Sequence, residues 1–321
     1  MRKRHIGFAA IVLPASLALS ACGGSGETAS GGVEAITVAT APVADYAPLY
    51  LGVEKGFFED QGLSVEFASG RVGTETITAV LSGSTDFAGV AVPPLLVAQG
   101  QKLDVSVVSP SSVAPEASHD SSVQLLVDPS SGISSEKDLE GKTVAVNALK
   151  AQLELMTRWH LESAGIDAES TKFVEVPFAE MPAALERGDV DAIAAVEPFL
   201  STALEEGATS IAEVDRALPP GAPITAFFTS DRMAKSDPEV VQKFSAAMTQ
   251  SLEYASQNPD EVRDVISEYS EVPPEVSAKM LLPAYGSTLQ REGMESTRDA
   301  MKRYGFLQND FDLNEIFWEQ Q

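Results

Sequence analysis

The chain has 321 residues, which is enough for two domains because single hydrophobic cores rarely grow beyond about 250–300 residues. Its 44% hydrophobic and 21% charged residues are typical of a folded globular protein and exclude a chain that is disordered throughout. The 47 acidic residues outnumber the 22 basic ones, for a formal charge of −25, so the surface repels phosphates and a nucleic-acid partner is not expected.

The first 21 residues have the organisation of a secretory signal peptide. Three basic residues at positions 2–4 precede an apolar stretch at 6–19, and signal peptides begin with such a charged region followed by a short apolar one. We therefore keep residues 1–21 out of the fold. No later segment has the 18 or so uninterrupted apolar residues of a membrane-spanning helix, so the rest of the chain is not expected to cross a membrane.

The signal peptide ends in Leu19-Ser20-Ala21-Cys22, which resembles the lipobox of bacterial lipoproteins. The resemblance implies that Cys22 carries a lipid and becomes the mature N-terminus; a plain secretory signal with an accidental cysteine is the alternative. Residues 22–32, rich in Gly and Ser, are expected to form a flexible tether. We predict a protein anchored on the extracytoplasmic face of the cell membrane, which is periplasmic if the organism has an outer membrane. Because Cys22 is the only cysteine, neither a disulfide nor a thiolate metal site is expected.

From residue 35 onward, short apolar segments alternate with helical ones, a pattern that is typical of parallel βαβ sheets. The expected strands are 35–39, 64–67, 104–109, 123–127, 143–146, 173–176 and 224–229, and the expected helices include 46–59 and 152–164. Residues 109–122, rich in Ser and Pro, are expected to form a loop. From residue 238 to 318 the pattern is helical.

One stretch of the chain occurs twice, at residues 76–98 and 181–204. In each copy a short helical run ends at a glycine, an aspartate follows three residues later, an apolar strand comes next, and a proline starts the following helix. These positions are Gly83, Asp86 and Pro93 in the first copy and Gly188, Asp191 and Pro198 in the second. Gly favours a helix end and Pro a helix start, and both punctuate most α/β proteins. The matched spacing nevertheless predicts two lobes built on one plan.

Four segments together resemble the NMT1/THI5-like solute-binding proteins of ABC importers, of the sulfonate, nitrate and taurine type. They are APLYLGVEKGFFEDQGLSVEF (47–67), DLEGKTVAVN (138–147), VPFAEMPAALERGDVDAIAAVEPF (176–199) and DPEVVQKFSAAMTQSLEYASQNPDEV (237–262). The resemblance covers about residues 35 to 305. It implies an α/β, two-lobed type II periplasmic-binding-protein fold with a central ligand cleft and C-terminal helices.

This resemblance places lobe 1 at residues 33–122 and 226–321 and lobe 2 at residues 123–225. It implies a monomer that binds a small-molecule solute between its lobes and delivers it to the transmembrane subunits of an ABC permease. No cofactor is implied.

In open α/β sheets, ligands bind beyond the carboxyl ends of the strands. On this rule the candidate ligand-binding residues are Asp45, Tyr46, Arg71, Gly73, Thr74, Glu75, Val90, Ala91, Val92, Asn147, Lys150, Glu197 and Phe199. Tyr46 and Phe199 could stack on a flat ligand, although aromatic residues near strand ends more often belong to the core.

The charged candidates leave two ligand classes open. The helix starts at residues 73–74 and 91–93 offer N–H donors to an anion, with Arg71 and Lys150 as cationic partners or as plain surface residues. Asp45, Glu75 and Glu197 would instead repel an anion and favour an amine or an amidine-like ring. The first expectation is a sulfonate, taurine or nitrate-type solute, and the alternative is a thiamine-precursor pyrimidine or another nitrogen heterocycle.

An enzyme is not expected. The resemblance includes one enzymatic relative, the THI5-type pyrimidine synthase, which uses an active-site His, a Cys-rich motif and pyridoxal phosphate. The three histidines here are His5 in the signal peptide, His119 in a Ser/Pro loop and His160 in a helix beside Trp159. The sequence therefore lacks the equipment of that enzyme and offers no metal-binding cluster.

Overall fold

The computed structural model describes residues 33–68 and 74–318. The predicted signal peptide, the tether and Cys22 lie outside these residues, as do Arg71 and Gly73. None of the helices within the described ranges has the length and hydropathy needed to span a bilayer.

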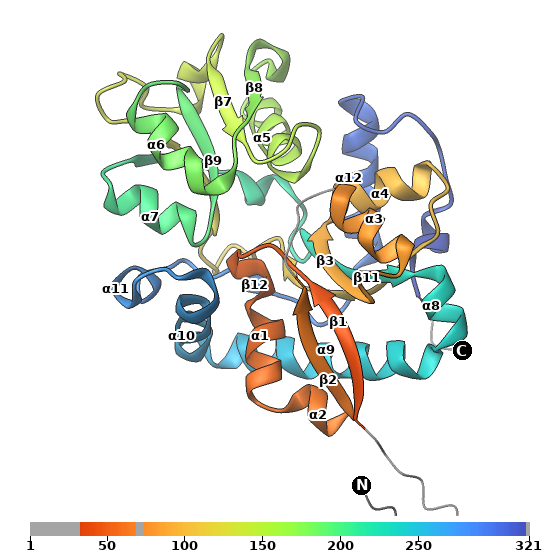
Figure 1. Cartoon of the computed structure of the whole chain (residues 1–321). Coiled ribbons are helices and arrows are strands. Elements are labelled where there is room, and N and C mark those ends of the chain that lie inside the picture. Colours follow the sequence, from red (N-terminus) through yellow and green to blue (C-terminus); the bar gives the residue numbers. More distant parts are fainter. Residues whose placement is uncertain (1–32, 69–73, 319–321) are drawn as a thin grey trace, which may run out of the picture. The chain divides into compact units, whose positions relative to one another are not determined.

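Two five-stranded sheets form the framework (Figure 1). The first sheet has the order β2-β1-β3-β11-β4 and the second the order β10-β6-β9-β7-β8. The strands of the first are β1 Glu34–Ala39, β2 Leu63–Ala68, β3 Phe87–Ala91, β4 Val105–Pro110 and β11 Thr225–Ser230. Those of the second are β6 Val123–Val127, β7 Thr143–Val146, β8 Lys172–Glu175, β9 Ala192–Val196 and β10 Thr209–Glu213.

The two sheets share one plan. In the first, β1 pairs in parallel with β2 and β3, and β11 runs antiparallel between β3 and β4. In the second, β7 pairs in parallel with β8 and β9, and β6 runs antiparallel between β9 and β10. Each sheet therefore contains the parallel βαβ part that the sequence predicted, together with antiparallel strands that make it mixed. The antiparallel strands β6 and β11, each next to an edge strand, are the two that follow residues 111–122 and 218–224, where the chain passes from one sheet to the other.

We call the first sheet with α1–α4 and α8–α12 the first lobe, and the second sheet with α5–α7 the second lobe. The first lobe contains α1 Ala47–Glu54, α2 Phe57–Asp60, α3 Thr74–Ser82, α4 Val92–Gly100, α8 Asp231–Ser236, α9 Pro238–Gln257, α10 Pro259–Ser270, α11 Pro274–Ser277 and α12 Arg291–Arg303. The second contains α5 Gln152–Ser163, α6 Met181–Glu186 and α7 Phe199–Glu205. The residue boundaries of the lobes stay predictions.

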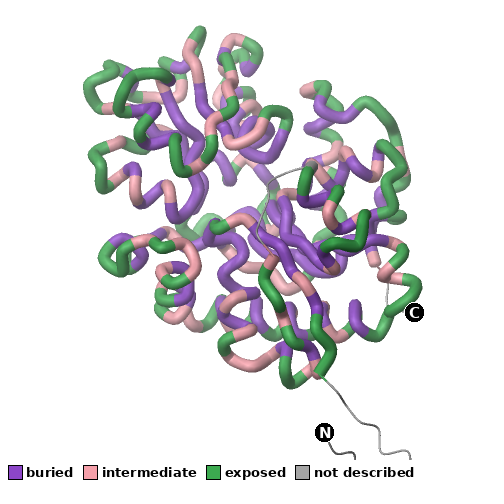
Figure 2. The backbone as a smooth tube through the Cα atoms, in the orientation of Figure 1, coloured by how far each residue is buried: buried purple, intermediate pink, exposed green. Residues whose placement is uncertain are grey.

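The inner strands of both sheets are buried, whereas the edge strands β2, β8 and β10 are partly exposed (Figure 2). In the first lobe α9 covers one face, where the rings of Phe87 and Phe244 stack with centroids 4.0 Å apart. Met294 and Met301 of α12 belong to a second cluster of buried residues with Leu95 of α4. Every residue of β9 is buried, which explains why its apolar run shows no alternation.

The aspartates of the two repeat copies each accept a hydrogen bond from the backbone of a neighbouring strand. Asp86 Oδ2 accepts hydrogen bonds from the backbone N–H and the hydroxyl of Thr37, both at 2.8 Å. Asp191 Oδ2 accepts one from the backbone N–H of Thr143, also at 2.8 Å. These strands, β1 and β7, are the equivalent middle strands of the parallel part of each sheet, so the repeated aspartate fixes the register of the same strand pair twice.

Three features differ from the sequence-based expectations. The helix predicted at 46–59 is broken at Gly56, whose φ of 80° lies in the left-handed region that favours glycine. The predicted loop 109–122 contains β5 Ser112–Val113, which pairs with β12 Ala284–Tyr285 from the predicted helical region. Strand β10 was not predicted, because its sequence TSIAE is short and half polar.

Candidate functional site

A cavity of about 100 Å³ lies where the carboxyl ends of the central strands of both sheets meet. It is larger than the space that one water molecule needs and suits a small solute. Residues of the first lobe that line it are Ala41, Asp45, Tyr46, Gly89, Val90, Ala91, Pro94 and Thr225. Residues of the second lobe that line it are Asn147, Ala148, Ala151, Gln152, Leu153, Phe178 and Val196.

Asp45 supplies the only carboxyl group among the lining residues that the structure describes. It lies in the short 3-10 turn Ala44–Tyr46, between β1 and α1. Ser112 Oγ donates to Asp45 Oδ1, and Ser111 Oγ donates to the Asp45 carbonyl oxygen at 2.6 Å. Burial raises the pKa of the Asp45 carboxyl, and the hydrogen bond from Ser112 opposes this. A hydrogen bond from the backbone N–H of Asp45 itself also lowers the pKa of this carboxyl.

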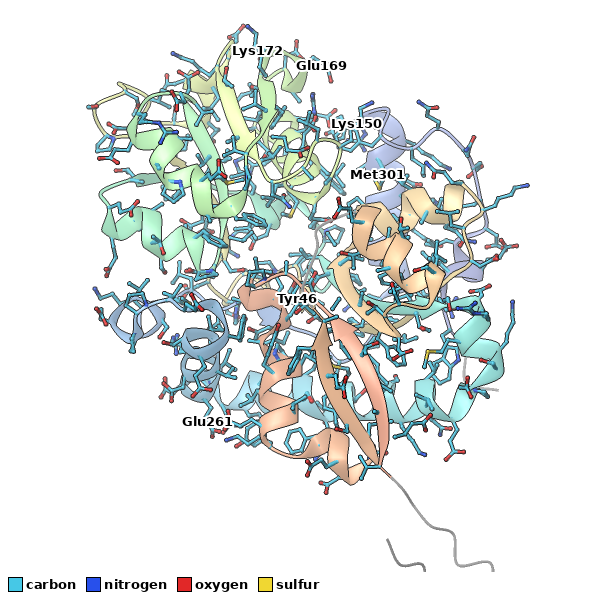
Figure 3. The ribbon with its side chains drawn as sticks, viewed as in Figure 1. Tyr46, Lys150, Glu169, Lys172, Glu261 and Met301 are labelled. Atoms are coloured by element: carbon cyan, nitrogen blue, oxygen red, sulfur yellow. The ribbon has the colours of Figure 1, made fainter. Side chains whose placement is uncertain are left out.

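Tyr46, which follows Asp45 in the chain, also lines the cavity; Figure 3 labels it in the first lobe. Its ring packs edge-on against Phe227, with centroids 5.7 Å apart, and lies so close to Gly89 that a Cβ there would be 2.6 Å from Tyr46 Cε1. Burial raises the pKa of Tyr46 well above its usual value, so the phenol stays neutral. The ring is thus a rigid apolar surface that carries one uncharged hydroxyl group.

The start of α5 forms the opposite wall. Ala151, the residue before the helix, has no side-chain cap, and within the described residues the backbone N–H groups of Gln152 and Leu153 have no acceptor. Gln152 is 5% exposed, and neither its Nε2 nor its Oε1 has a hydrogen-bond partner among the described residues. Free N–H groups at a helix start favour an electron-rich group.

The cavity otherwise offers few polar groups. Asn147 adds a carboxamide, and the hydroxyl of Thr225 lies 2.8 Å from Ser112 Oγ. Among the lining residues within 33–68 and 74–318 there is no Lys or Arg. Most of the wall is apolar, so the described surface provides no cation to balance an anionic solute.

Five of the residues predicted from the sequence line this cavity: Asp45, Tyr46, Val90, Ala91 and Asn147. Arg71 and Gly73 lie outside the described residues. Thr74 begins α3, and Glu75 lines a separate hollow together with Ala79 and Ser82. The structure therefore gathers the predicted residues of the turn after β1, of β3 and of the loop after β7, but not those of α3.

Lys150 does not line the cavity. It lies in the exposed loop before α5, has a left-handed backbone with φ of 55°, and donates its backbone N–H to Glu154 Oε2 at 2.6 Å. Figure 3 shows it on the second lobe, well away from Tyr46.

The sequence predicted N–H donors for an anion at residues 91–93, and the start of α4 does not offer them. Val92 is fully buried and its N–H donates to the carbonyl oxygen of Ile224 at 3.0 Å. The next two residues, Pro93 and Pro94, have no N–H. The first three residues of α4 therefore leave no N–H donor for a ligand.

Glu197 is buried away from the cavity lining and joins the two lobes. Its Oε1 accepts from the backbone N–H of Leu281 at 3.0 Å and from Ser201 Oγ at 2.8 Å, while its carbonyl oxygen accepts from the N–H of Ala44 at 2.9 Å. Burial raises the pKa of Glu197 to about 7. The residue thus has a structural explanation that the sequence did not suggest.

Phe199 stacks on Phe178, with centroids 5.5 Å apart and ring planes at 5°. Only Phe178 lines the cavity, so Phe199 supports the wall from behind. Sequence reasoning missed Gly89, Gln152, Phe178 and Thr225. For Gln152 a signal existed, because the predicted helix begins at this residue and its side chain is polar.

Comparisons with known proteins agree with this geometry. The model of the family described as NMT1/THI5 like matches residues 43–262. A putative aliphatic sulfonates-binding protein of Bacillus subtilis is 24% identical over 242 residues, which cover 73% of this chain and 70% of that protein. A formylaminopyrimidine-binding protein of Halalkalibacterium halodurans is 26% identical over 229 residues, which cover 70% of this chain and 67% of that protein.

Among solved structures, the alkanesulfonate-binding protein SsuA of Xanthomonas axonopodis pv. citri, bound to MOPS, matches with a TM-score of 0.75 and 19% identity. The match covers 89% of this chain and 99% of that chain. The two-lobed α/β fold that the sequence predicted is therefore confirmed. Taken with the family model, which spans more than half of the sequence, the fold and the cavity between its sheets lead to one assignment: the chain belongs to the NMT1/THI5-like family.

Proposed function

We propose that the chain is the extracytoplasmic solute-binding component of an ABC importer, which captures a small organic solute between its lobes and delivers it to the permease. The observation that carries the proposal is the cavity, because both lobes contribute its walls at the carboxyl ends of their strands. A solute that contacts both walls binds more tightly when the lobes are closed than when they are open. Its binding therefore stabilises the closed arrangement. The relatives described above are themselves binding proteins.

The proposal includes the attachment of the protein to the membrane. Lipidation at Cys22 and a tether at residues 22–32 would hold a monomeric body near the permease on the extracytoplasmic side. The motif in the sequence is the support for this part.

Two observations bear on the class of solute. The relatives from Bacillus subtilis and Xanthomonas axonopodis, with the free N–H groups at the start of α5, support a sulfonate, taurine or nitrate-type solute. The relative from Halalkalibacterium halodurans, with Asp45 in the cavity and no Lys or Arg in its described lining, supports a pyrimidine or another nitrogen heterocycle. As far as the described residues go, the chemistry of the cavity favours the second class, because they offer no cationic partner and a buried anion without one is costly.

A THI5-type synthase finds no support in the positions of the histidines. His119 lies 3.1 Å from the carbonyl oxygen of Leu282, and His160 is partly buried in α5. Neither residue lines the cavity. This supports a binding protein that is not an enzyme.

The proposal is tested by measuring ligand binding and lobe closure on the same sample. A panel of alkanesulfonates, taurine, nitrate, aminopyrimidines and simple amines is screened by thermal shift. A ligand at about a hundred times its Kd adds about 2.7 kcal/mol and raises the melting temperature by a few degrees. Small-angle scattering should then show a smaller radius of gyration with that ligand. A tight ligand that leaves the radius unchanged would contradict capture between the lobes.

A further inference from the structure

We infer that Tyr269 of α10 and Tyr285 of β12 are positioning residues of the solute site, although neither lines the cavity. Their hydroxyl groups hold the turn that carries Asp45 and Tyr46 in its binding geometry before the lobes close. The inference rests on the proposed function and concerns the first-lobe wall of the same cavity.

The first support is a run of three successive carbonyl groups in this turn. Tyr269 donates its hydroxyl to the carbonyl oxygen of Val43 at 2.8 Å. Tyr285 donates its hydroxyl to the carbonyl oxygen of Ala44 at 2.9 Å. The next carbonyl oxygen accepts from the Ser111 hydroxyl at 2.6 Å. Each residue of the run is therefore bound by a hydroxyl group from a different and distant part of the chain.

The second support is the small sheet of β5 and β12, which presents donors to this turn from both of its strands. Tyr285 pairs with Ser112 across the sheet. The Ser112 hydroxyl donates to the side chain of Asp45, while the Tyr285 hydroxyl donates to the carbonyl oxygen of the residue before it. The pairing of the two strands thus brings both donors to the same turn.

The third support is the fixed position of the Tyr269 ring. It stacks on Tyr50 of α1, with centroids 4.0 Å apart and ring planes at 13°. Tyr50 in turn stacks on Phe67 at 4.5 Å, and its hydroxyl oxygen lies 2.8 Å from Thr40 Oγ1. Because stacking already restricts the ring, little further conformational entropy is lost when its hydroxyl binds the turn.

Both phenols are neutral donors at physiological pH. Burial raises the pKa of Tyr269 and that of Tyr285 well above the usual value, and the charge of the Asp45 carboxylate raises both further. Each hydroxyl group therefore keeps the proton that it donates to the turn.

These contacts do not depend on the second lobe. The donors lie in α10, in β12 and in the segment at residues 111–112, whereas the second lobe binds the turn through the carbonyl oxygen of Glu197, which accepts from the N–H of Ala44 at 2.9 Å. Separation of the lobes at this point breaks the bond to Glu197 and leaves the hydroxyl bonds in place. The first-lobe wall is thus preformed, and the solute does not have to order it on binding.

The inference is tested by ¹⁵N relaxation of the full, unliganded protein, followed by calorimetric titration. The variants are Tyr269→Phe, Tyr285→Phe and the double variant, which remove the hydroxyl groups and keep the rings. The matched control is Tyr254→Phe in α9, because the hydroxyl group of Tyr254 donates to Glu261 at 3.0 Å and not to the turn.

We expect backbone order parameters of about 0.85 for residues 43–46 in the wild type, falling toward about 0.6 in the double variant. Those of β3 and β11 should stay unchanged. A general loss of stability does not produce this pattern, since it leaves the folded molecules as rigid as before. Tyr254→Phe should leave the turn as rigid as in the wild type.

The titration uses ethanesulfonate, taurine, nitrate and 4-amino-2-methylpyrimidine as probes. For any of them that binds, the double variant should raise the Kd by about five- to tenfold, because part of the binding free energy now goes into ordering the turn. The single variants should have smaller effects, and Tyr254→Phe should leave the Kd unchanged.

Three results would overturn the inference. The first is a turn that is already flexible in the wild type, and the second is one that stays rigid in the double variant; both apply even if no probe binds. The third is a probe whose Kd the double variant does not change. None of these results touches the proposed function, which fails on the scattering measurement described above.

Discussion

Asp86 and Asp191 make the same contact in different lobes: each accepts a hydrogen bond of 2.8 Å from the backbone N–H of a threonine in the adjacent parallel strand. Each also returns a bond from its own N–H to the carbonyl oxygen of that threonine, at 3.1 Å and 2.9 Å. The recurrence of Asp three residues after Gly in the sequence therefore reflects a strand-pairing requirement rather than a binding role.

Replacing either aspartate should destabilise its lobe. Asp86→Ala and Asp191→Ala each leave a backbone N–H without its side-chain acceptor, and we expect a loss of about 1–3 kcal/mol in the free energy of unfolding. Urea denaturation measures it. Asp189→Ala is the control, because this exposed residue makes only a surface ion pair with Arg187 and should change stability by about 0.5 kcal/mol or less. Equal effects of Asp189→Ala and Asp191→Ala would refute the interpretation.

Glu197 should make stability depend on pH. Burial raises the pKa of its carboxyl from an ordinary value of 4.5 to about 7, so the folded state holds this proton more tightly than the unfolded chain. Stability from this group is full below pH 4.5 and falls as the pH rises toward 7, by about 1.4 kcal/mol per unit and about 3 kcal/mol in all.

Glu197→Gln replaces the ionisable carboxyl group by a neutral amide. The amide oxygen can still accept the hydrogen bond from the backbone N–H of Leu281. Relative to the wild type, the variant should therefore gain stability between pH 4.5 and pH 7.5, as measured by urea unfolding at both values. The exposed Glu206→Gln serves as control for the loss of one charge nearby. A difference between wild type and Glu197→Gln that does not change with pH would contradict the assignment.

Gly89→Ala should damage the cavity. The new Cβ would lie 2.6 Å from Tyr46 Cε1 and 3.1 Å from Phe227 Cε1, so the Tyr46 ring must move. Overpacking of this kind costs about 1–3 kcal/mol of stability. We expect a lower melting temperature and, for any ligand found, a higher Kd by titration. Gly141→Ala, at a glycine with open space around it but a φ of 75°, should lower stability without changing Kd. Unchanged binding by Gly89→Ala would show that Tyr46 does not shape the site.

The ion pair between Glu162 of α5 and Arg303 of α12 joins the second lobe to the first at 2.8 Å. Tyr304, the residue after α12, also donates its hydroxyl to Glu162. Because both charged side chains are about half exposed, the pair should contribute only about 0–1 kcal/mol to the closed arrangement. Arg303→Met should therefore raise the Kd of a ligand by about fivefold at most, with a smaller effect at high salt. A tenfold loss that persists at high salt would mean that this contact governs closure.

The sequence predicted strand positions well where every or nearly every residue of the strand is buried. The expected strands 123–127 and 143–146 coincide with β6 and β7, because their apolar runs lie between helices on both faces. It failed where pairing is long-range: the two-residue strand at Ser112 depends on Tyr285, far along the chain, and no local pattern marks it. The break at Gly56 was missed because apolar residues continue at helical spacing on both sides of it.

The rule that ligands lie beyond strand ends selected Asp45, Tyr46 and Asn147, which line the cavity, and their role in binding stays a prediction. It could not tell which side chains turn toward the cavity. Lys150 was predicted to face the cavity but does not line it, and its backbone is left-handed. Glu197 does not line it either, because its carboxylate binds the backbone N–H of Leu281, which comes from a distant segment. The Gln152 amide has no partner among the described residues, and no pattern in the sequence marks this.

The two prolines at the start of α4 have a consequence for how binding specificity can change. To hold an oxyanion at the start of α4, the chain would have to recover backbone donors at Pro93 and Pro94, and the N–H of Val92 would still be bonded to Ile224. Conversion of this helix start to an oxyanion site would thus be a problem of main-chain redesign, which side-chain substitutions at these positions alone would not solve unless they replaced both prolines.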